Sequence, residues 1–397
     1  MKHPLLPLFA TTLLATALAA PPARGEALDA SPFAWRVPIA VSGYAGASPL
    51  TNFPVLVTLA AGSPSGFDYA DCAEDGSDLR FADADGAILP HEIDTWDPSG
   101  ESFVWVGLPV LTNGAAFSLY YGGAVSQPAP PATNVWTRYA AVFHGGATIA
   151  DATGNAADVR PNGVLGVASG GRAGGAMDKG ANVGLQFSNP VASGALASAA
   201  RVSVSGWFRR SNSGSTAIVA ANKNAWGETG FLGIVEGGTY FSVAVDGTHQ
   251  GATGKGALAK GEWGHLAFAY DTTNVASYFD GEPIFAKPNG KPLADKGDAY
   301  WAFGSYNNQN KDCFQGAMDE LRVFDGIASA DWIRAEHDSV ADPAAFAVRG
   351  AVAPVGQGGA KQEQAVEDKQ RADDARRVVE TLDRVLGEEV DEPGGNH

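Results

Sequence analysis

Two acidic residues one step apart on a predicted strand are the side chains in this sequence best suited to catalysis. They lie in the segment His91-Glu92-Ile93-Asp94-Thr95-Trp96-Asp97, where strand geometry would place Glu92 and Asp94 on one face. A retaining glycosidase needs such a pair, with carboxyl groups about 5 Å apart, as nucleophile and acid. Acids at this spacing are also typical of a solvated strand face. We expect that structural role for them and assign no catalytic residue.

Sugar binding is the chemistry that two polar loops favour. It requires an exposed aromatic ring for stacking beside amide or carboxylate groups that hydrogen-bond to hydroxyls. The candidate carbohydrate-binding residues are Asn224, Trp226 and Glu228 in one loop and Tyr306, Asn307 and Asn308 in the other. The alternative is structural, because a loop Trp also packs over the rim of a sandwich and Asn-rich turns form for backbone reasons.

Several other classes of function find no support. No Gly-x-Ser-x-Gly elbow lies at a strand-to-helix turn, and the sequence shows no nucleophile partner for His144, His265 or His337. We expect His265 to be structural and the Gly-rich stretch from Gly170 to Gly175 to be a loop, since no phosphate loop fits an all-β protein. The formal net charge of −17 disfavours nucleic acid as a partner, because phosphate binding needs clustered Lys and Arg.

Short strands are the elements that would carry these residues. The chain has 397 residues, of which 50 are Gly, a composition typical of strands and turns and a length that allows two or three domains. We predict an all-β protein with a β-sandwich over residues 32–125, a Pro-rich linker over 126–134 and a jelly roll over 135–346. Within the jelly roll, residues 163–184 lack periodicity and are expected to loop over the sandwich edge.

The N-terminus predicts export. Residues 1–26 contain Lys2 ahead of the apolar run from Leu5 to Ala20, and Ala17-Leu18-Ala19 near the end of this run offers a cleavage site of small residues, the pattern of a signal peptide. We therefore expect a secreted, periplasmic or cell-envelope protein; an uncleaved anchor is the alternative. No later stretch of the sequence is apolar over the length that a membrane helix needs.

The two cysteines, Cys72 and Cys313, lie far apart in the sequence. In an exported protein they could form one disulfide between the domains. Two separate thiols are the alternative, and the sequence does not decide between them.

Three segments near the C-terminal end of the predicted jelly roll carry a family resemblance. They read W-G-H-L-A-F-A-Y-D, S-Y-F-D-G-E and F-Q-G-A-M-D-E-L-R-V-F-D-G-I-A-S-A-D-W-I, and they resemble the closing strands of a concanavalin A-like, laminin G-type jelly roll. The resemblance implies a fold that hosts lectins, adhesion modules and a few hydrolases. It also implies a calcium role for Asp319, with oxygens of Asp151, Asn155 and Asp158 as candidate partners. A turn or ion-pair role for Asp319 is the alternative.

The first predicted domain carries a second resemblance. The segments F-A-W-R-V-P-I, N-F-P-V-L-V, G-S-D-L-R-F, L-P-H-E-I-D-T-W-D, V-W-V and L-Y-Y-G are similar, in this order, to a bacterial family known only as domain of unknown function 2341. Members of that family occur in secreted or envelope proteins beside laminin G-like domains. The resemblance implies no known activity and no known site.

The last part of the chain, residues 347–397, is predicted to be a flexible spacer followed by a charged helix over 361–386. From all these features we expect an exported, non-catalytic module that binds a polysaccharide or surface glycan at the rim of the jelly roll. One alternative is a structural protein of the cell envelope, docked through the tail helix and associated with a proton-channel-type transport complex. The other is a glycoside hydrolase or lyase.

Overall fold

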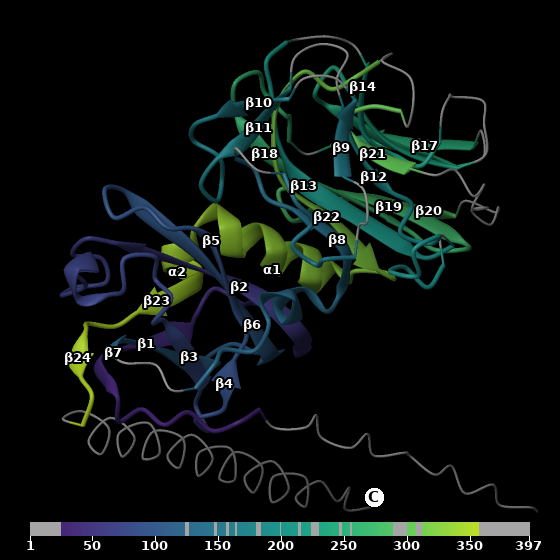
Figure 1. The fold of residues 1–397 in the computed structure, drawn as a ribbon. Coiled ribbons are helices and arrows are strands. Elements are labelled where there is room, and N and C mark those ends of the chain that lie inside the picture. The colour runs from purple at the N-terminus through teal and green to yellow at the C-terminus, as the bar shows by residue number, and fades with distance from the viewer. Residues whose placement is uncertain are drawn as a thin grey trace, which may run out of the picture.

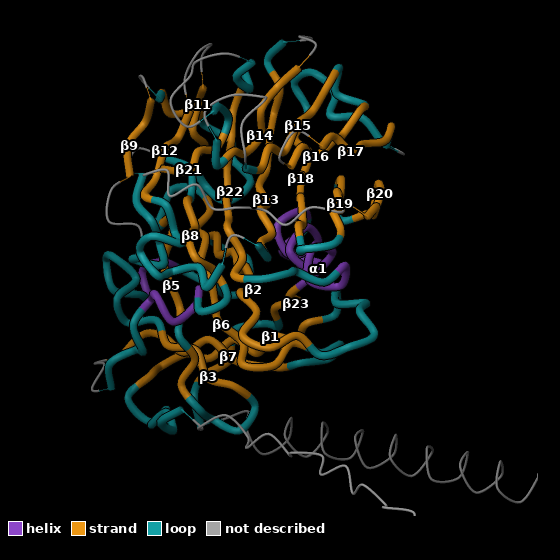
Figure 2. The backbone as a smooth tube through the Cα atoms, turned by 90° about the vertical axis from the view of Figure 1, so that its right-hand side faces the viewer, coloured by secondary structure: helices purple, strands orange, loops and turns teal. Residues whose placement is uncertain are grey.

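The computed structural model describes residues 25–123, 127–146, 149–155, 159–162, 165–179, 184–198, 200–212, 216–223, 230–245, 248–254, 256–288, 300–306 and 312–356. Its secondary structure consists mostly of antiparallel strands, as the sequence predicts, and it has two β-domains, one above the other in Figure 2. Among the described residues there is no helix with the length and apolar character needed to cross a membrane.

The first domain is a sandwich of a six-stranded and a three-stranded sheet. The larger sheet consists of β1 (Phe33–Val41), β3 (Arg80–Asp83), β4 (Ile88–Leu89), β7 (Ala116–Gly123), β23 (Ala347–Arg349) and β24 (Ala353–Pro354). The smaller sheet has the order β2 (Leu50–Ala60), β6 (Glu101–Leu111) and β5 (His91–Thr95). There are also two 3-10 turns, η1 (Tyr69–Asp71) and η2 (Ala132–Trp136), and η2 contacts all three strands of the smaller sheet. β1 buries alternate residues from Val37 to Val41, whereas β2 and β6 bury nearly all of their central residues, so the smaller sheet is covered on both faces.

The second domain is a jelly roll of two larger sheets. One sheet contains β8 (Tyr139–Phe143), β10 (Gly166–Ala168), β11 (Ala176–Lys179), β13 (Val202–Arg210), β18 (Trp263–Tyr270), β19 (Asn274–Phe279), β20 (Glu282–Pro288) and β22 (Gly316–Asp325). The other contains β9 (Val159–Asn162), β12 (Gly184–Ser188), β14 (Thr216–Ala221), β15 (Phe231–Glu236), β16 (Tyr240–Val245), β17 (Thr248–Thr253) and β21 (Tyr300–Phe303).

The hairpin between β19 and β20 shows how local sequence determines this fold. Asp280 and Gly281 connect the two strands with positive φ values of 48° and 76°. A two-residue hairpin with positive φ at both positions matches the right-handed twist of the strands, and Asp-Gly tolerates that backbone.

The Gly-rich region between residues 163 and 184 departs from the expected loop. It contains β10 and β11, and β11 pairs with β22 through Met177 and Met318. Sequence periodicity misses these strands because they are only three and four residues long.

The helices α1 (Ala330–Ala341) and α2 (Pro343–Phe346) follow β22 and lie between the domains, as Figure 1 shows. Ser329 caps α1 by accepting a hydrogen bond from the backbone N–H of Trp332. The Trp332 ring packs edge-on against Phe53 of β2, with ring centres 5.0 Å apart. One buried apolar cluster therefore includes residues of both domains and of α1.

The chain then returns to the first domain, which corrects the predicted spacer. Residues 347–349 and 353–354 form β23 and β24, and both pair with β1. They supply backbone partners to an edge that would otherwise be open. The spacer prediction is therefore wrong for residues 347–354. The helix predicted over 361–386 lies outside the described residues.

Candidate functional site

A pocket of about 350 Å³ lies where β5 of the first domain faces the jelly roll. Its lining comprises Glu92, Ile93, Asp94 and Thr95 from β5 and His144, Gly145, Gly146, Ala150, Ala152 and Gly175 from the second domain. The two acidic residues that the sequence singles out thus share a pocket with an imidazole and with the backbone of three glycines.

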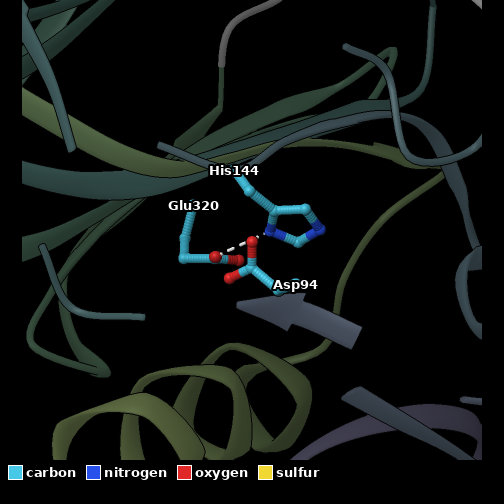
Figure 3. A group of neighbouring side chains, drawn as sticks. All are labelled: Asp94, His144 and Glu320. Atoms are coloured by element: carbon cyan, nitrogen blue, oxygen red, sulfur yellow. Dashed lines mark hydrogen bonds and ion pairs between the residues drawn. The ribbon is translucent and has the colours of Figure 1, made fainter. Parts of the chain in front are cut away.

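Asp94 reaches this pocket because β5 carries a β-bulge. Ile93 pairs with Val104 and Thr95 pairs with Phe103, so Asp94 is an extra residue in β5 relative to β6. A bulge re-aims the side chain of the extra residue and interrupts the ladder. Figure 3 shows the Asp94 carboxylate beside the imidazole of His144 and the carboxylate of Glu320.

Glu320 lies in a second bulge, in β22. Ser205 pairs with Arg322 and Trp207 pairs with Asp319, so β22 has one residue more than β13 over this interval. Glu320 has a φ of 50°, in the left-handed region that a residue with a long side chain seldom adopts. Such backbone strain recurs at functional sites, where the surrounding structure must stabilise it.

His144 lies between Glu320 and Glu92 and contacts both carboxylates. Its Nδ1 lies 2.7 Å from Oε1 of Glu320, and its Nε2 lies 3.6 Å from Oε2 of Glu92. The same Glu92 oxygen accepts a hydrogen bond from Nε1 of Trp136. Asp94, His144 and Glu320 each place one ligand-type atom within 4.8 Å of the other two.

Arg322 forms hydrogen bonds to one carboxylate of the cluster and to a carboxylate of α1. Its guanidinium donates to Oε2 of Glu320 at 2.8 Å and to Oε1 of Glu336, on α1, at 3.2 Å. The guanidinium also packs on the ring of Trp105 from the first domain, with 4.6 Å between the guanidinium carbon and the ring centre. Because Arg322 is 1% exposed, it joins the two domains and α1 in one buried polar network.

Burial and neighbouring charges shift the protonation of these groups. Burial raises the pKa of Asp94 to about 8, against the opposing attraction of His144. For His144, burial alone would lower the pKa, but the carboxylates of Glu320 and Asp94 outweigh it and raise the pKa well above the ordinary value. At neutral pH the site thus favours a protonated Asp94 beside a cationic His144.

The prediction that Glu92 and Asp94 lie on a solvated strand face is therefore wrong. β5 has one side against the jelly roll, His91 is buried, and Glu92 and Asp94 are only partly exposed. The sequence could not indicate this, because alternation predicts two faces but not which of them another domain covers.

The predicted calcium residues have other partners. Oδ1 of Asp319 accepts hydrogen bonds from the backbone N–H groups of Gly145 and Glu320, and Oδ2 accepts from those of Arg172 and Ala173. Four donors occupy the acceptor positions of one carboxylate, which argues against Asp319 as a calcium ligand. Calcium binding itself stays a prediction.

The partners proposed for Asp319 do not form a cation site in the described part of the chain. Oδ1 of Asp151 accepts from the backbone N–H groups of Val142 and Thr153 and so holds the turn after β8. Asn155 lies on the same turn, and Asp158 lies outside the described residues.

Of the six predicted sugar-binding residues, Tyr306 alone lies among the described residues. Tyr306 is only 3% exposed and packs with Ile218 and Leu232, so it is not the exposed ring that stacking requires. The other five candidates, Asn224, Trp226, Glu228, Asn307 and Asn308, lie outside the described residues.

Two further groups resolve questions that the sequence leaves open. Cys72 and Cys313 form no disulfide with each other. His265 is 1% exposed and packs beside Trp207, in agreement with the structural role expected for it.

Sequence reasoning missed His144 and Glu320 as parts of the site. His144 follows a strand end, and Glu320 stands in the conspicuous Met318-Asp319-Glu320-Leu321 segment, but 176 positions separate the two residues. The available signal was the pair of adjacent acids, Asp319 and Glu320, at the start of the predicted strand. We predicted a ligand role for Asp319, whereas Glu320 is the acid that contacts His144.

Comparisons with known proteins agree with the two resemblances. Residues 75–146 match the family model described as Domain of unknown function (DUF2341), and residues 180–334 match that of the concanavalin A-like lectin/glucanases superfamily. A comparison with curated proteins found no match.

Solved structures with some similarity include a domain of an extracellular arabinanase and a receptor binding domain of a neurotoxin. Domain 4 of AbnA, a GH43 extracellular arabinanase from Geobacillus stearothermophilus solved with arabinotriose, has 19% identity and a TM-score of 0.40, covering 50% of this chain and 97% of that domain. The receptor binding domain of a botulinum neurotoxin C/D mosaic serotype has 13% identity and a TM-score of 0.40, covering 51% of each chain. Of the ten residues that line the pocket, seven lie within the match at residues 75–146, and Ala150, Ala152 and Gly175 lie between that match and the one at residues 180–334.

Proposed function

We propose that the protein is an exported, non-catalytic binding module that recognises a polysaccharide or surface glycan, with one sugar unit held in the pocket between its domains. The observation that carries the proposal is the pocket itself, about 350 Å³ and lined by Glu92, Asp94, His144 and glycine backbone. Carboxylates, an imidazole and backbone groups are suitable partners for sugar hydroxyls, and a pocket of this size lies in the range of small-ligand sites. The concanavalin A-like fold is consistent with a binding role.

Affinity electrophoresis of the full chain through gels that contain plant, algal and bacterial polysaccharides tests this function. We expect at least one polymer to retard migration, and Asp94→Asn to weaken that retardation on the order of tenfold, the effect of one lost buried hydrogen bond. Glu262→Gln, an exposed acid on the second domain, is the matched control. Loss in Trp226→Ala with none in Asp94→Asn would place the ligand at the predicted rim instead. Unretarded migration in every gel would count against the binding function.

An enzyme is the second candidate, and the protonation of Asp94 favours it. A buried acid with a pKa of about 8 beside a second carboxylate is the kind of pair that glycoside hydrolysis uses as acid and partner. Release of reducing ends, or of unsaturated products, from a retarding polymer would support a hydrolase or lyase. Asp94→Asn should then abolish release while binding persists; no product from any bound polymer would leave the non-catalytic function.

An envelope partner bound through the tail is tested by deletion. Because residues 347–354 pair with β1, the deletion must begin at residue 357 to leave the first domain intact. Unchanged association with envelope proteins after this deletion would contradict docking through the tail. Calcium should be added and omitted in parallel gels, since a calcium role is still only predicted.

A further inference from the structure

Negative charge exceeds positive charge inside the cluster between the domains. The carboxylates are those of Glu92, Asp94, Glu320 and Glu336, and the cationic groups are those of Arg322 and His144. Four carboxylates against two cations leave an excess of two negative charges if all are ionised. Uncompensated charge is unfavourable where water is excluded, so the cluster must take up protons or bind a cation.

Besides Nε of Arg322, two polar atoms of this cluster, both on pocket-lining residues, have no hydrogen-bond partner among the described residues. They are Oδ2 of Asp94 and Nε2 of His144, and both atoms are buried. The His144 side chain as a whole is buried, with 9% of the residue exposed, and it lines the pocket together with Asp94. Buried polar atoms are nearly always satisfied, so each of these exceptions calls for an explanation, such as an ion or a water.

The spacing of the groups suits a small metal ion. Nε2 of His144 and Oε2 of Glu92 are 3.6 Å apart. Two ligand atoms that each lie about 2.0–2.2 Å from one tetrahedral ion are separated by roughly 3.3–3.6 Å. The Asp94 carboxylate also lies against the imidazole, with its ligand-type atom within 4.8 Å of those of His144 and Glu320 (Figure 3).

Glu320 and Trp136 complete the pattern as supporting groups. Glu320 Oε1 lies 2.7 Å from Nδ1 of His144, so it can accept the Nδ1 proton and leave Nε2 as the free lone pair. Metal-binding histidines nearly always have such a carboxylate or carbonyl on the other ring nitrogen. Trp136 donates to Glu92 and would orient that carboxylate in the same way.

We propose that the pocket between the domains binds a divalent transition-metal ion of the zinc class, held by the imidazole of His144 and the carboxylates of Asp94 and Glu92, with Glu320 positioning the imidazole. An imidazole ligand favours zinc-type ions, whereas calcium prefers six to eight oxygens. With His144 bound as a neutral ligand, four carboxylates of the cluster face the one cation Arg322, so a divalent ion would offset two of three excess negative charges. The inference does not depend on the glycan function, because metal binding is measured without any sugar.

Equilibrium dialysis of the full chain, without an affinity tag, against Zn²⁺ alone tests the proposal. We expect one bound ion per chain. Asp94→Asn should weaken zinc binding on the order of 100-fold, since it removes a ligand, and Glu320→Gln by about 10- to 100-fold, since it removes a positioning group. Glu262→Gln should bind like the wild type. Co²⁺ in place of Zn²⁺ should give a visible absorption spectrum in the wild type that Asp94→Asn lacks.

The proposal is overturned if the wild type binds no zinc, or if Asp94→Asn and Glu320→Gln bind it as tightly as the wild type. Circular dichroism and thermal unfolding establish that each variant is folded. Should Glu320→Gln fail to fold, Asp94→Asn decides alone, because Oδ2 of Asp94 has no hydrogen-bond partner among the described residues for the substitution to remove. A rise in melting temperature with Zn²⁺ in the wild type, absent in folded Asp94→Asn, gives an independent measure.

Discussion

Replacing Arg322 by Met should destabilise the protein by an amount that depends on pH. Arg322 is buried and pairs with Glu320 and Glu336, so the substitution removes the cation and leaves two buried carboxylates. In the variant, Glu320 still has His144 as an ion-pair partner at 2.7 Å. Glu336 retains, among the described residues, only its hydrogen bond from the hydroxyl of Ser205. Removing one partner of a buried pair is far more harmful than replacing the whole pair by neutral groups.

The magnitude follows from the proton that Glu336 would take up in the variant. Its ordinary pKa is 4.5, so protonating it at pH 7 requires about 2.5 units at 1.36 kcal/mol per unit, or roughly 3.4 kcal/mol. At pH 5 the same step requires only about 0.7 kcal/mol. The folded variant holds Glu336 with a pKa raised above that of the unfolded chain, so its deficit grows as pH rises and shrinks as pH falls. Because burial already raises the pKa of Glu336 in the wild type, 3.4 kcal/mol is an upper value.

Urea unfolding of the wild type and Arg322→Met at pH 7 and pH 5 measures this difference. The matched control is the triple variant with Glu320→Gln and Glu336→Gln, which removes the charges together and should recover most of the lost stability. The reasoning is refuted if Arg322→Met loses less than about 1 kcal/mol at pH 7, or if its loss is the same at both pH values.

Three other predictions concern parts of the fold around the site. Trp332→Ala should lower the free energy of unfolding by about 3–5 kcal/mol, because the ring fills the shared core against Phe53; a loss under about 1 kcal/mol in urea unfolding would contradict the shared core. Asp319→Asn should lose more than about 2 kcal/mol in the same assay, since an amide NH₂ would face backbone donors, and wild-type stability in this variant would mean that those four hydrogen bonds are absent. Burial, His337 and Arg322 lower the pKa of His265 well below 6.5, so the unfolded chain takes up a proton first and stability falls as pH drops below about 6.5. Melting temperatures from pH 7.5 to 5 should fall less steeply for His265→Leu than for the wild type, and parallel slopes would exclude His265 as the cause.

Much of the fold could be predicted from the sequence. The alternation of residues predicts β1 and β18, and Asp280-Gly281 predicts the hairpin between β19 and β20. These features are visible in the sequence because a strand or a turn depends on residues that are neighbours in the chain. The two family resemblances reached the same result. The short strands β10 and β11 escaped because three or four residues do not establish a period.

For a related reason, the sequence indicated only two residues of the candidate site, Glu92 and Asp94. Glu92 and Asp94 attracted notice because they are close in sequence, and local spacing is what a single sequence displays. Asp94 and Glu320 meet beside His144 because their strands bulge, and a bulge depends on the register with a partner strand. Residues 347–354 return to β1 because β1 has a free edge in the folded first domain, and the sequence does not show which strand has a free edge.

The sequence by itself thus determined the strands, the turns and the two domain types, since side-chain period and turn chemistry act over a few residues. Only the tertiary structure decided which face of β5 is covered, which acid of the Asp319-Glu320 pair meets His144, and that Arg322 is shared by two domains and α1. These outcomes depend on packing between segments as far apart as the 176 positions between His144 and Glu320. Burial and charge act across such distances only after the chain has folded.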